Sequence, residues 1–375
     1  MAVDGSMRAA ILEEPHADLK IEEVLVPKPK VGKVLLKVSA CGVCHSDLHV
    51  IKDEIPFPTP AVLGHEVSGT VEALGPGLEE RAEELSEGTR VAASFVMPCG
   101  ECRHCVKGRD DVCERFFALN RLKGLLYDGE TRLFRRDGSP LYMYSMGGLA
   151  EYAVVPIIDV FPLPEGLPLE ESSILGCAVF TAYGAVRHAA DLSPREKVAV
   201  VAVGGVGSNI VQISRAFGAS RVIAVDVRQA ALDFAKDLGA TDTVNGAEED
   251  AVVRVKELTD GEGVDVAFEA LGRPETFAQA TGMVRDAGRM VAVGLAPRGD
   301  TAPVEITQLV RRSQRIVGSF GARTRADMPE VLSLAAQGFL DPKPVVTQKF
   351  SLEEADSAYK ALNQGEVVGR AVIVP

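Results

Sequence analysis

Four closely spaced cysteines form the first group of residues in this 375-residue chain that could bind a metal ion. Glycines and charged residues between them supply turns through which four thiolates can reach one tetrahedral Zn²⁺. Four protein ligands leave no coordination position open, so the spacing predicts a structural zinc. An iron–sulfur cluster or two disulfides are the alternatives, but their usual spacings and settings differ. The pattern is Cys-x₂-Cys-x₂-Cys-x₇-Cys, at Cys99, Cys102, Cys105 and Cys113.

A glycine-rich turn follows an apolar run and precedes an amphipathic stretch at residues 208–217. It departs from G-x-G-x-x-G only in its first position, which is alanine, and its glycines would let a pyrophosphate approach a helix N-terminus. Asp226 ends the next apolar run, where a carboxylate can bind ribose hydroxyls and repel a 2′-phosphate. We therefore expect NAD(H) over NADP(H), with Arg228 nearby as the opposing feature. The turn reads Ala202-Val203-Gly204-Gly205-Val206-Gly207.

The hydrophobic pattern changes along the chain. Up to about Cys177, short β-rich runs such as 34–38 and 67–74 alternate with Pro and Gly clusters, which predicts an irregular, mostly antiparallel β domain. From Lys197, apolar strands alternate with helical stretches, which predicts a doubly wound parallel sheet of about six strands. The clearest strand candidates there are residues 198–203, 222–225, 264–268, 290–293 and 316–317.

The alternation stops after about residue 321. Helices near 328–337 and 352–362 and a last strand at 371–374 are expected there, and we assign this tail to the first domain. The expected domains are therefore residues 1–178, with a zinc lobe at about 95–115, then 179–322, then 323–375 as a return to the first.

Composition narrows the class of protein. The formal net charge of −13 argues against a nucleic-acid partner. Neither an 18-residue apolar run nor a signal-peptide pattern is present, which predicts a cytoplasmic enzyme without a membrane partner. Seven cysteines in such a protein indicate metal binding or catalysis more than disulfides.

A second set of cysteine and histidine motifs is spread along the chain. Together with the four cysteines, the glycine turn and Asp226, it makes the chain resemble the zinc-dependent alcohol dehydrogenases of the medium-chain dehydrogenase/reductase superfamily. The resemblance covers essentially the whole chain and implies an α/β protein: a GroES-like, mostly antiparallel β catalytic domain plus a Rossmann nucleotide-binding domain. The motifs are Cys44-His45-Ser46-Asp47, Gly64-His65-Glu66, Gly176-Cys177 before Thr181-Ala182-Tyr183-Gly184, and Gly369-Arg370.

The resemblance also implies a catalytic zinc bound by Cys44, His65 and Cys177, with the fourth position open. Two thiolates would neutralise the ion and keep it Lewis-acidic. Asp47 would orient His65, and Glu66 would tune the coordination sphere or transiently enter it.

Further roles follow from the same resemblance. Ser46 would bind the substrate oxygen and His49 would end a proton relay to solvent, while hydride passes to the nicotinamide. Phe95 and Ile55 would be walls of the substrate pocket. Residues expected at the cofactor are Thr181 at the nicotinamide, the backbone from Val293 to Leu295 at its carboxamide, and His45 and Arg370 at the pyrophosphate.

The same residues have other interpretations. Cys41 and Cys44 form a Cys-x-x-Cys pair, but no thioredoxin-like βα setting follows it, so we expect Cys41 to be a small buried residue. His65 could be structural, but Cys44 and Cys177 favour a ligand role. Polyol and threonine dehydrogenases typically have a carboxylate at the position of Cys177, so this cysteine favours the alcohol dehydrogenases.

Several functions therefore remain open. A glutathione-linked formaldehyde dehydrogenase is suggested by residues 123–129, although no convincing basic anchor for glutathione is evident. A semialdehyde or hydroxyacid reductase is a further enzyme, and a catalytically silent zinc- and NAD-binding protein is the alternative from another class. We expect a homo-oligomer, dimer or tetramer, with residues 290–293 and 316–320 extending a sheet across a two-fold axis.

Overall fold

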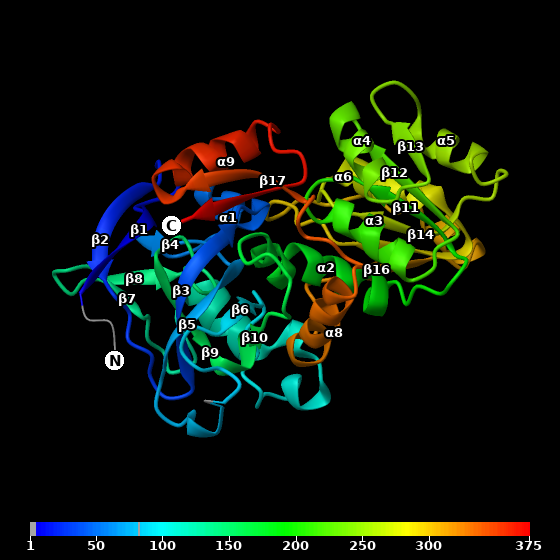
Figure 1. Ribbon diagram of the computed structural model, residues 1–375. Coiled ribbons are helices and arrows are strands. Elements are labelled where there is room, and N and C mark those ends of the chain that lie inside the picture. Colours follow the sequence, from blue (N-terminus) through cyan, green and yellow to red (C-terminus); the bar gives the residue numbers. More distant parts are fainter. Residues whose placement is uncertain (1–4, 82) are drawn as a thin grey trace. The chain divides into compact units, whose positions relative to one another are not determined.

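The computed structural model describes residues 5–81 and 83–375, and the chain divides into two compact units (Figure 1). The first unit runs to Phe180 and takes in Arg323–Gln337 and Asp341–Pro375. The second unit comprises Thr181–Ala322 and Gly338–Leu340.

The first unit contains two β-sheets in which most strand pairs are antiparallel. The smaller sheet has the order β2 (Lys20–Leu25), β1 (Ser6–Leu12), β4 (Ala61–Val62), β8 (Pro140–Met143) and β7 (Leu133–Phe134). The larger sheet has the order β10 (Val160–Pro162), β6 (Arg90–Ala93), β5 (Val67–Leu74), β3 (Lys33–Gly42), β18 (Arg370–Val374) and β17 (Val346–Ser351), with β9 (Tyr152–Pro156) also paired to β3.

The long strand β3 organises the larger sheet. It pairs antiparallel with β5, β9 and β18, and its buried apolar residues Val34, Leu35 and Leu36 explain why this run was recognisable in the sequence. The last strand, β18, pairs with the end of β3 through Val372 opposite Gly42. This pairing places residues near the C-terminus beside the end of β3.

The second unit contains a six-stranded parallel sheet, which confirms the expected doubly wound fold. Its strands are uniformly apolar at their centres because helices cover both faces, so residues such as Ala199, Ile223 and Ala267 are fully buried. The order is β13 (Asp242–Asn245), β12 (Arg221–Asp226), β11 (Lys197–Val201), β14 (Val264–Glu269), β15 (Val284–Ala292) and β16 (Arg315–Gly318).

The helices connect these strands. In the second unit they are α3 (Gly207–Ala216), α4 (Gln229–Asp237), α5 (Ala251–Glu257), α6 (Pro274–Met283) and α7 (Ile306–Arg311). The remaining helices are α1 (His45–Ile51), α2 (Ala178–Gly184), α8 (Thr324–Ala336) and α9 (Ala355–Asn363). Among the described residues, none of the helices has the length and apolar character needed to cross a membrane.

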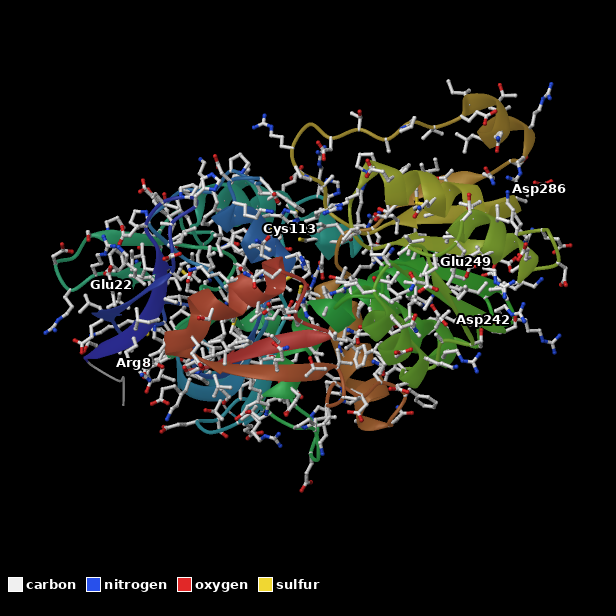
Figure 2. The ribbon with its side chains drawn as sticks, turned by 90° about the horizontal axis from the view of Figure 1, so that it is seen from above. Arg8, Glu22, Cys113, Asp242, Glu249 and Asp286 are labelled. Atoms are coloured by element: carbon white, nitrogen blue, oxygen red, sulfur yellow. The ribbon has the colours of Figure 1, made fainter. Side chains whose placement is uncertain are left out.

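Charged side chains occupy the outer surfaces of both units. Figure 2 labels Arg8 and Glu22 on the paired strands β1 and β2, and Asp242 and Asp286 in the second unit. Arg8 forms an ion pair with Glu151 at 2.8 Å, but both side chains are partly exposed, so water screens this contact.

The glycine turn after β11 uses an unusual backbone conformation. Ala202 has φ +68°, in the left-handed region, and its N–H donates to the carbonyl of Val225 at 2.8 Å. A Cβ on Gly207 would lie 2.0 Å from the carbonyl oxygen of Ala202, whereas a Cβ on Gly204 would meet open space. Gly207 is therefore required because the turn packs closely against the start of the helix. Ala202 adopts its left-handed conformation at a cost in backbone strain.

We expect Ala202→Gly to stabilise the protein by about 1 kcal/mol, because glycine adopts the left-handed conformation without the Cβ penalty. This corresponds to a rise of roughly 2 to 4 °C in the midpoint of thermal unfolding. Ala199→Gly, at a buried position in the middle of β11, is the matched control and should lower the midpoint. Equal destabilisation by both variants would contradict the strain at Ala202.

Candidate metal and cofactor sites

The four cysteines of the expected zinc lobe converge on one point. Their sulfur atoms all lie within 4.8 Å of one another, and all seven cysteines of the chain are free thiols, so the alternative of two disulfides is wrong. Backbone N–H groups also point at the sulfurs: that of Cys102 donates to Cys99 Sγ at 3.3 Å, and that of Cys99 donates to Cys113 Sγ at 3.3 Å. This donor set fits one tetrahedral Zn²⁺.

Burial raises the pKa of Cys105 and of Cys113, whereas at Cys102 the surrounding N–H groups favour the thiolate. Burial by itself raises the pKa of Cys102, but the backbone N–H groups of Cys105, Glu114 and His104 outweigh it and lower that pKa to about 6. A thiol that ionises this readily is prepared to bind a metal ion.

An ion pair between a buried carboxylate and a partly exposed arginine ties the lobe to helix α8. The carboxylate of Asp110 accepts from Arg325 Nη2 at 2.6 Å and from the Arg325 backbone N–H at 3.0 Å. The Asp110 side chain is almost completely buried, so this contact holds the lobe against α8 within the first unit. The sequence carried no signal for it because the partners are 215 residues apart.

The second cluster assembles from three separate segments of the first unit. Cys44 has extended backbone angles and immediately precedes α1, His65 and Glu66 lie between β4 and β5, and Cys177 immediately precedes α2. One potential ligand atom from each of the four residues lies within 4.8 Å of the others, and all four residues are buried. The three expected zinc ligands are thus brought together.

Asp47, on α1, holds His65 in one orientation. Its Oδ1 accepts from the Gly64 N–H at 2.9 Å and lies 3.2 Å from His65 Nδ1. This bond places the proton on Nδ1 and leaves Nε2 as the nitrogen for a metal. Burial lowers the pKa of His65, but the charges of Asp47 and Cys44 raise it to about 9, so metal binding here displaces a proton.

Glu66 is paired with Arg370 from the last strand. The two side chains form an ion pair, and both are almost completely buried. A Cβ on Gly42 would lie 2.2 Å from Glu66 Oε2, so glycine is needed there to make room for the carboxylate. Arg370, which we expected at the cofactor pyrophosphate, has its guanidinium against Glu66, whose Oε1 also lies 4.0 Å from His65 Nε2.

The expected proton-relay residues lie on α1. Ser46 and His49 are three residues apart and therefore lie on the same side of the helix, and both are half-buried, whereas His45 is exposed. His49 Nδ1 lies 2.5 Å from Glu54 Oε2. Glu54 is a partner that sequence analysis missed, because a glutamate five residues further along carries no distinctive pattern.

Aromatic side chains surround His65. The ring of Phe95, an expected pocket wall, lies 5.9 Å from the imidazole, and the ring of Tyr144 lies 5.8 Å from it, both edge to face. Phe57 packs against Tyr144 at 5.0 Å. Ile55, the other expected wall, is half-buried and donates its N–H to the His49 carbonyl at 3.2 Å. Sequence reasoning missed Tyr144 because it lies 79 positions beyond His65 without a motif.

The second unit presents the expected dinucleotide features at the carboxyl ends of its strands. Helix α3 begins at Gly207 directly after the turn. The carboxylate of Asp226 accepts from the N–H groups of Val203 and Arg228, each at 3.0 Å, and Arg228 Nε lies 3.6 Å from it. Arg228 is thus engaged with the same carboxylate that we expect at the ribose.

Of the remaining cofactor candidates, Val293 and Leu295 follow the end of β15, whereas Thr181 lies within α2. Val293 is buried and donates its N–H to the carbonyl of Glu269 at 2.8 Å. The carbonyl of Val293 takes no part in this hydrogen bond. Leu295 and Thr181 are half-buried.

Comparison with known proteins identifies the family. Residues 30–165 match the alcohol dehydrogenase GroES-like domain, and residues 205–337 match the zinc-binding dehydrogenase family. An S-(hydroxymethyl)glutathione dehydrogenase from Escherichia coli is 33% identical over 371 residues, which covers 98% of this chain and 99% of that protein. The chain belongs to the zinc-dependent alcohol dehydrogenases. It is therefore an oxidoreductase of the medium-chain dehydrogenase/reductase superfamily, as the sequence motifs predicted.

Solved structures agree with this zinc-dependent alcohol dehydrogenase fold. An alcohol dehydrogenase zinc-binding domain protein from Burkholderia ambifaria superposes with a TM-score of 0.92 at 31% identity, covering 100% of both chains. A benzyl alcohol dehydrogenase from Acinetobacter calcoaceticus superposes with a TM-score of 0.91 at 30% identity, covering 99% of each. The predicted GroES-like and Rossmann architecture is confirmed.

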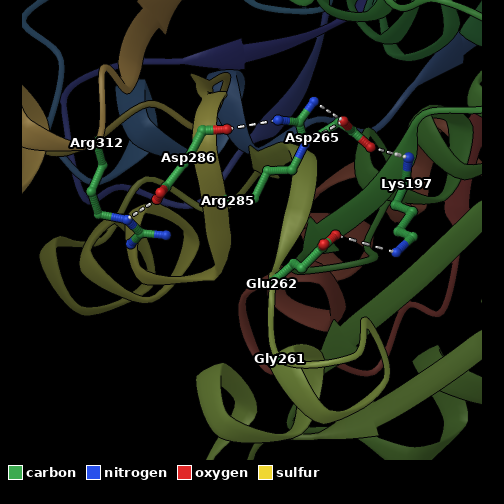
Figure 3. Close-up of a pocket in the computed structure, with 7 residues that line it drawn as sticks. All are labelled: Lys197, Gly261, Glu262, Asp265, Arg285, Asp286 and Arg312. Carbon is green, nitrogen blue, oxygen red and sulfur yellow. Dashed lines mark hydrogen bonds and ion pairs between the residues drawn. The ribbon is translucent and has the colours of Figure 1, made fainter.

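A charged pocket of about 580 Å³ in the second unit has a different character (Figure 3). It adjoins Lys197, where β11 begins, whereas dinucleotides bind this fold beyond the carboxyl ends of the strands. Its charges are mutually paired: Arg285 lies 2.5 Å from Asp265, and Arg312 lies 2.6 Å from Asp286. We therefore do not assign it to the dehydrogenase chemistry.

We expect Cys105→Ser to reduce the bound zinc by about one ion per chain and to lower the midpoint of thermal unfolding by several degrees, because the lobe then has three thiolates. Metal analysis and a thermal melt measure both effects. Cys41→Ala is the control, since Cys41 is a buried thiol outside both clusters. Unchanged zinc content in Cys105→Ser would refute the four-cysteine site.

Proposed function

We propose that this zinc-dependent alcohol dehydrogenase uses NAD(H) and two zinc ions per chain to interconvert alcohols with aldehydes or ketones. The convergence of Cys44, His65 and Cys177 carries the proposal, because two thiolates and one neutral imidazole leave a tetrahedral zinc with one open position. The residues fit the ion chemically: the Nδ1 bond to Asp47 directs Nε2 of His65 toward the two sulfurs.

Each side chain around this centre has a proposed task. When bound, the zinc supplies Lewis acidity at the substrate oxygen and NAD supplies a hydride acceptor. Ser46 binds the substrate hydroxyl and takes its proton outward along α1 to His49, whose Nδ1 is held by Glu54. Phe95 and Tyr144 beside His65 exclude water from the reacting carbon.

The preference for NAD(H) rests on Asp226. Its carboxylate is fixed by two backbone N–H groups at the end of β12, where a 2′-phosphate would meet a negative charge. The N-terminus of α3 and the open space above Gly204 suit a pyrophosphate. Thr181, Val293 and Leu295 are the proposed partners of the nicotinamide. His45 and Arg370 are the other proposed cofactor contacts, with the Arg370 role limited by its pairing with Glu66.

The test follows absorbance of NADH while zinc-loaded protein meets a panel of alcohols, aldehydes and ketones, with NADP run in parallel. We expect turnover with NAD above that with NADP, and a loss of about 10³-fold in kcat/KM in Cys44→Ser, since Lewis acidity contributes several kcal/mol. Cys41→Ala is again the matched control. Wild-type turnover that survives in Cys44→Ser without its catalytic metal would contradict the mechanism.

We also propose that the chain forms a homo-oligomer through the edge of the parallel sheet. Strand β16 pairs only with β15 in that sheet, among the described residues, and the nearby helix α7 exposes Ile306 and Val310 to 74% and 69%. An edge strand with adjacent apolar side chains suits pairing across a two-fold axis. Sedimentation velocity should detect a dimer or tetramer, and a monomer at micromolar concentration would refute the interface.

A further inference from the structure

Among the buried polar atoms near the metal cluster that lack a hydrogen-bond partner are Nη1 of Arg121 and the hydroxyl of Tyr144. Neither has a partner among residues 5–81 and 83–375, and Oδ2 of Asp47 is a further unsatisfied atom there. Arg121 ends the π-helical segment Phe116–Arg121, and its guanidinium carbon lies 4.0 Å from the centre of the Tyr144 ring. The two unsatisfied groups are therefore neighbours.

This pair lies close to the expected zinc ligands. The centre of the Tyr144 ring lies 5.8 Å from that of the His65 ring and 4.0 Å from the guanidinium carbon of Arg121. Together these two distances set an upper limit on the separation of Arg121 from His65. All three residues belong to the first unit. A small molecule whose oxygen lies at the metal cluster could therefore reach Arg121 with a group a few bonds away.

Arg121 is half-buried, and the buried arginines described in the first unit have carboxylate partners. Arg132 is paired with Asp128, and Arg370 with Glu66. Arg121 has no ion pair within the described part of the chain, and its guanidinium carbon lies 4.0 Å from the centre of the Tyr144 ring and 6.0 Å from that of Phe116. Its buried Nη1 has no acceptor, so an anionic ligand there would satisfy a charged donor that is otherwise unpaired.

We infer that Arg121 and Tyr144 form a recognition subsite for a carboxylate on the substrate. The inference rests on the proposed function and adds a substrate class: alcohols or aldehydes that carry one carboxylate a few bonds from the reacting carbon. A guanidinium stacked on a ring keeps its edge N–H groups free to bind two carboxylate oxygens, and the tyrosine hydroxyl adds a third donor.

The charge around the subsite favours a monoanion. Burial raises the pKa of the Tyr144 hydroxyl, and the charge of Arg121 opposes that rise, so the hydroxyl stays protonated and can donate to a carboxylate. One guanidinium in such surroundings balances a single carboxylate, whereas a phosphate dianion would be left with uncompensated charge.

The experiment compares kcat/KM for matched substrates: 4-(hydroxymethyl)benzoate against 4-methylbenzyl alcohol, and 4-hydroxybutanoate against 1-butanol. We expect the wild type to favour the carboxylates and Arg121→Met to lower the carboxylate-to-neutral ratio by about 10- to 100-fold, mainly through KM, as for loss of a charged hydrogen bond. Arg121→Lys and Tyr144→Phe should each lower the ratio less. Arg136→Met, which removes a 68%-exposed arginine, is the control and should leave it unchanged.

Calorimetric titration with benzoate separates this inference from the proposed function, because it needs no turnover. If the wild type turns over neither member of either pair, the proposed function fails, and benzoate binding still tests the subsite. Binding that Arg121→Met abolishes supports the subsite. Equal binding to both proteins, no carboxylate preference in the wild type, or an equal loss for both substrates in Arg121→Met would overturn it.

Discussion

One carboxylate oxygen, Oδ1 of Asp47, fixes the geometry of the metal centre. It accepts from the Gly64 N–H and from the His65 ring, so it sets both the path of the backbone and the orientation of the imidazole. Gly64 has φ +96°, and a Cβ there would lie 2.7 Å from Cys41 Sγ and from the Leu149 nitrogen. The backbone before His65 therefore has room for glycine alone, and the position of Nε2 relative to the thiols follows from that packing.

A second enclosed charge pair, Glu66 with Arg370, stands beside this centre. Buried ion pairs add little net stability, but removal of one partner leaves an uncompensated charge and is strongly destabilising. Gly42 makes room for the Glu66 carboxylate, and β18 supplies its cation. The arrangement fixes a carboxylate near the metal ligands while keeping it neutralised, which suits a site that must retain the Lewis acidity of its ion.

The features that could be predicted from the sequence are those encoded locally. The four cysteines lie within one short segment, and most strands of the parallel sheet have apolar centres, so spacing and periodicity sufficed for these features. Strands β13 and β17 were missed because they are short and largely polar, with sequences Asp-Thr-Val-Asn and Val-Thr-Gln-Lys-Phe-Ser. The placement of Arg121 on Tyr144 arises from packing between distant segments, so neither residue carries a local signal.

The separation of β3 and β18 along the sequence has a consequence for biosynthesis. During translation β3 and β5 are made long before β18, so β3 at first lacks its partner β18 and Glu66 lacks Arg370. The four-cysteine lobe has all its ligands in one early segment and can load its ion on the nascent chain. The catalytic centre reaches its charge balance only when Arg370 has been made, so the two metal sites become complete in the order of their residues along the chain.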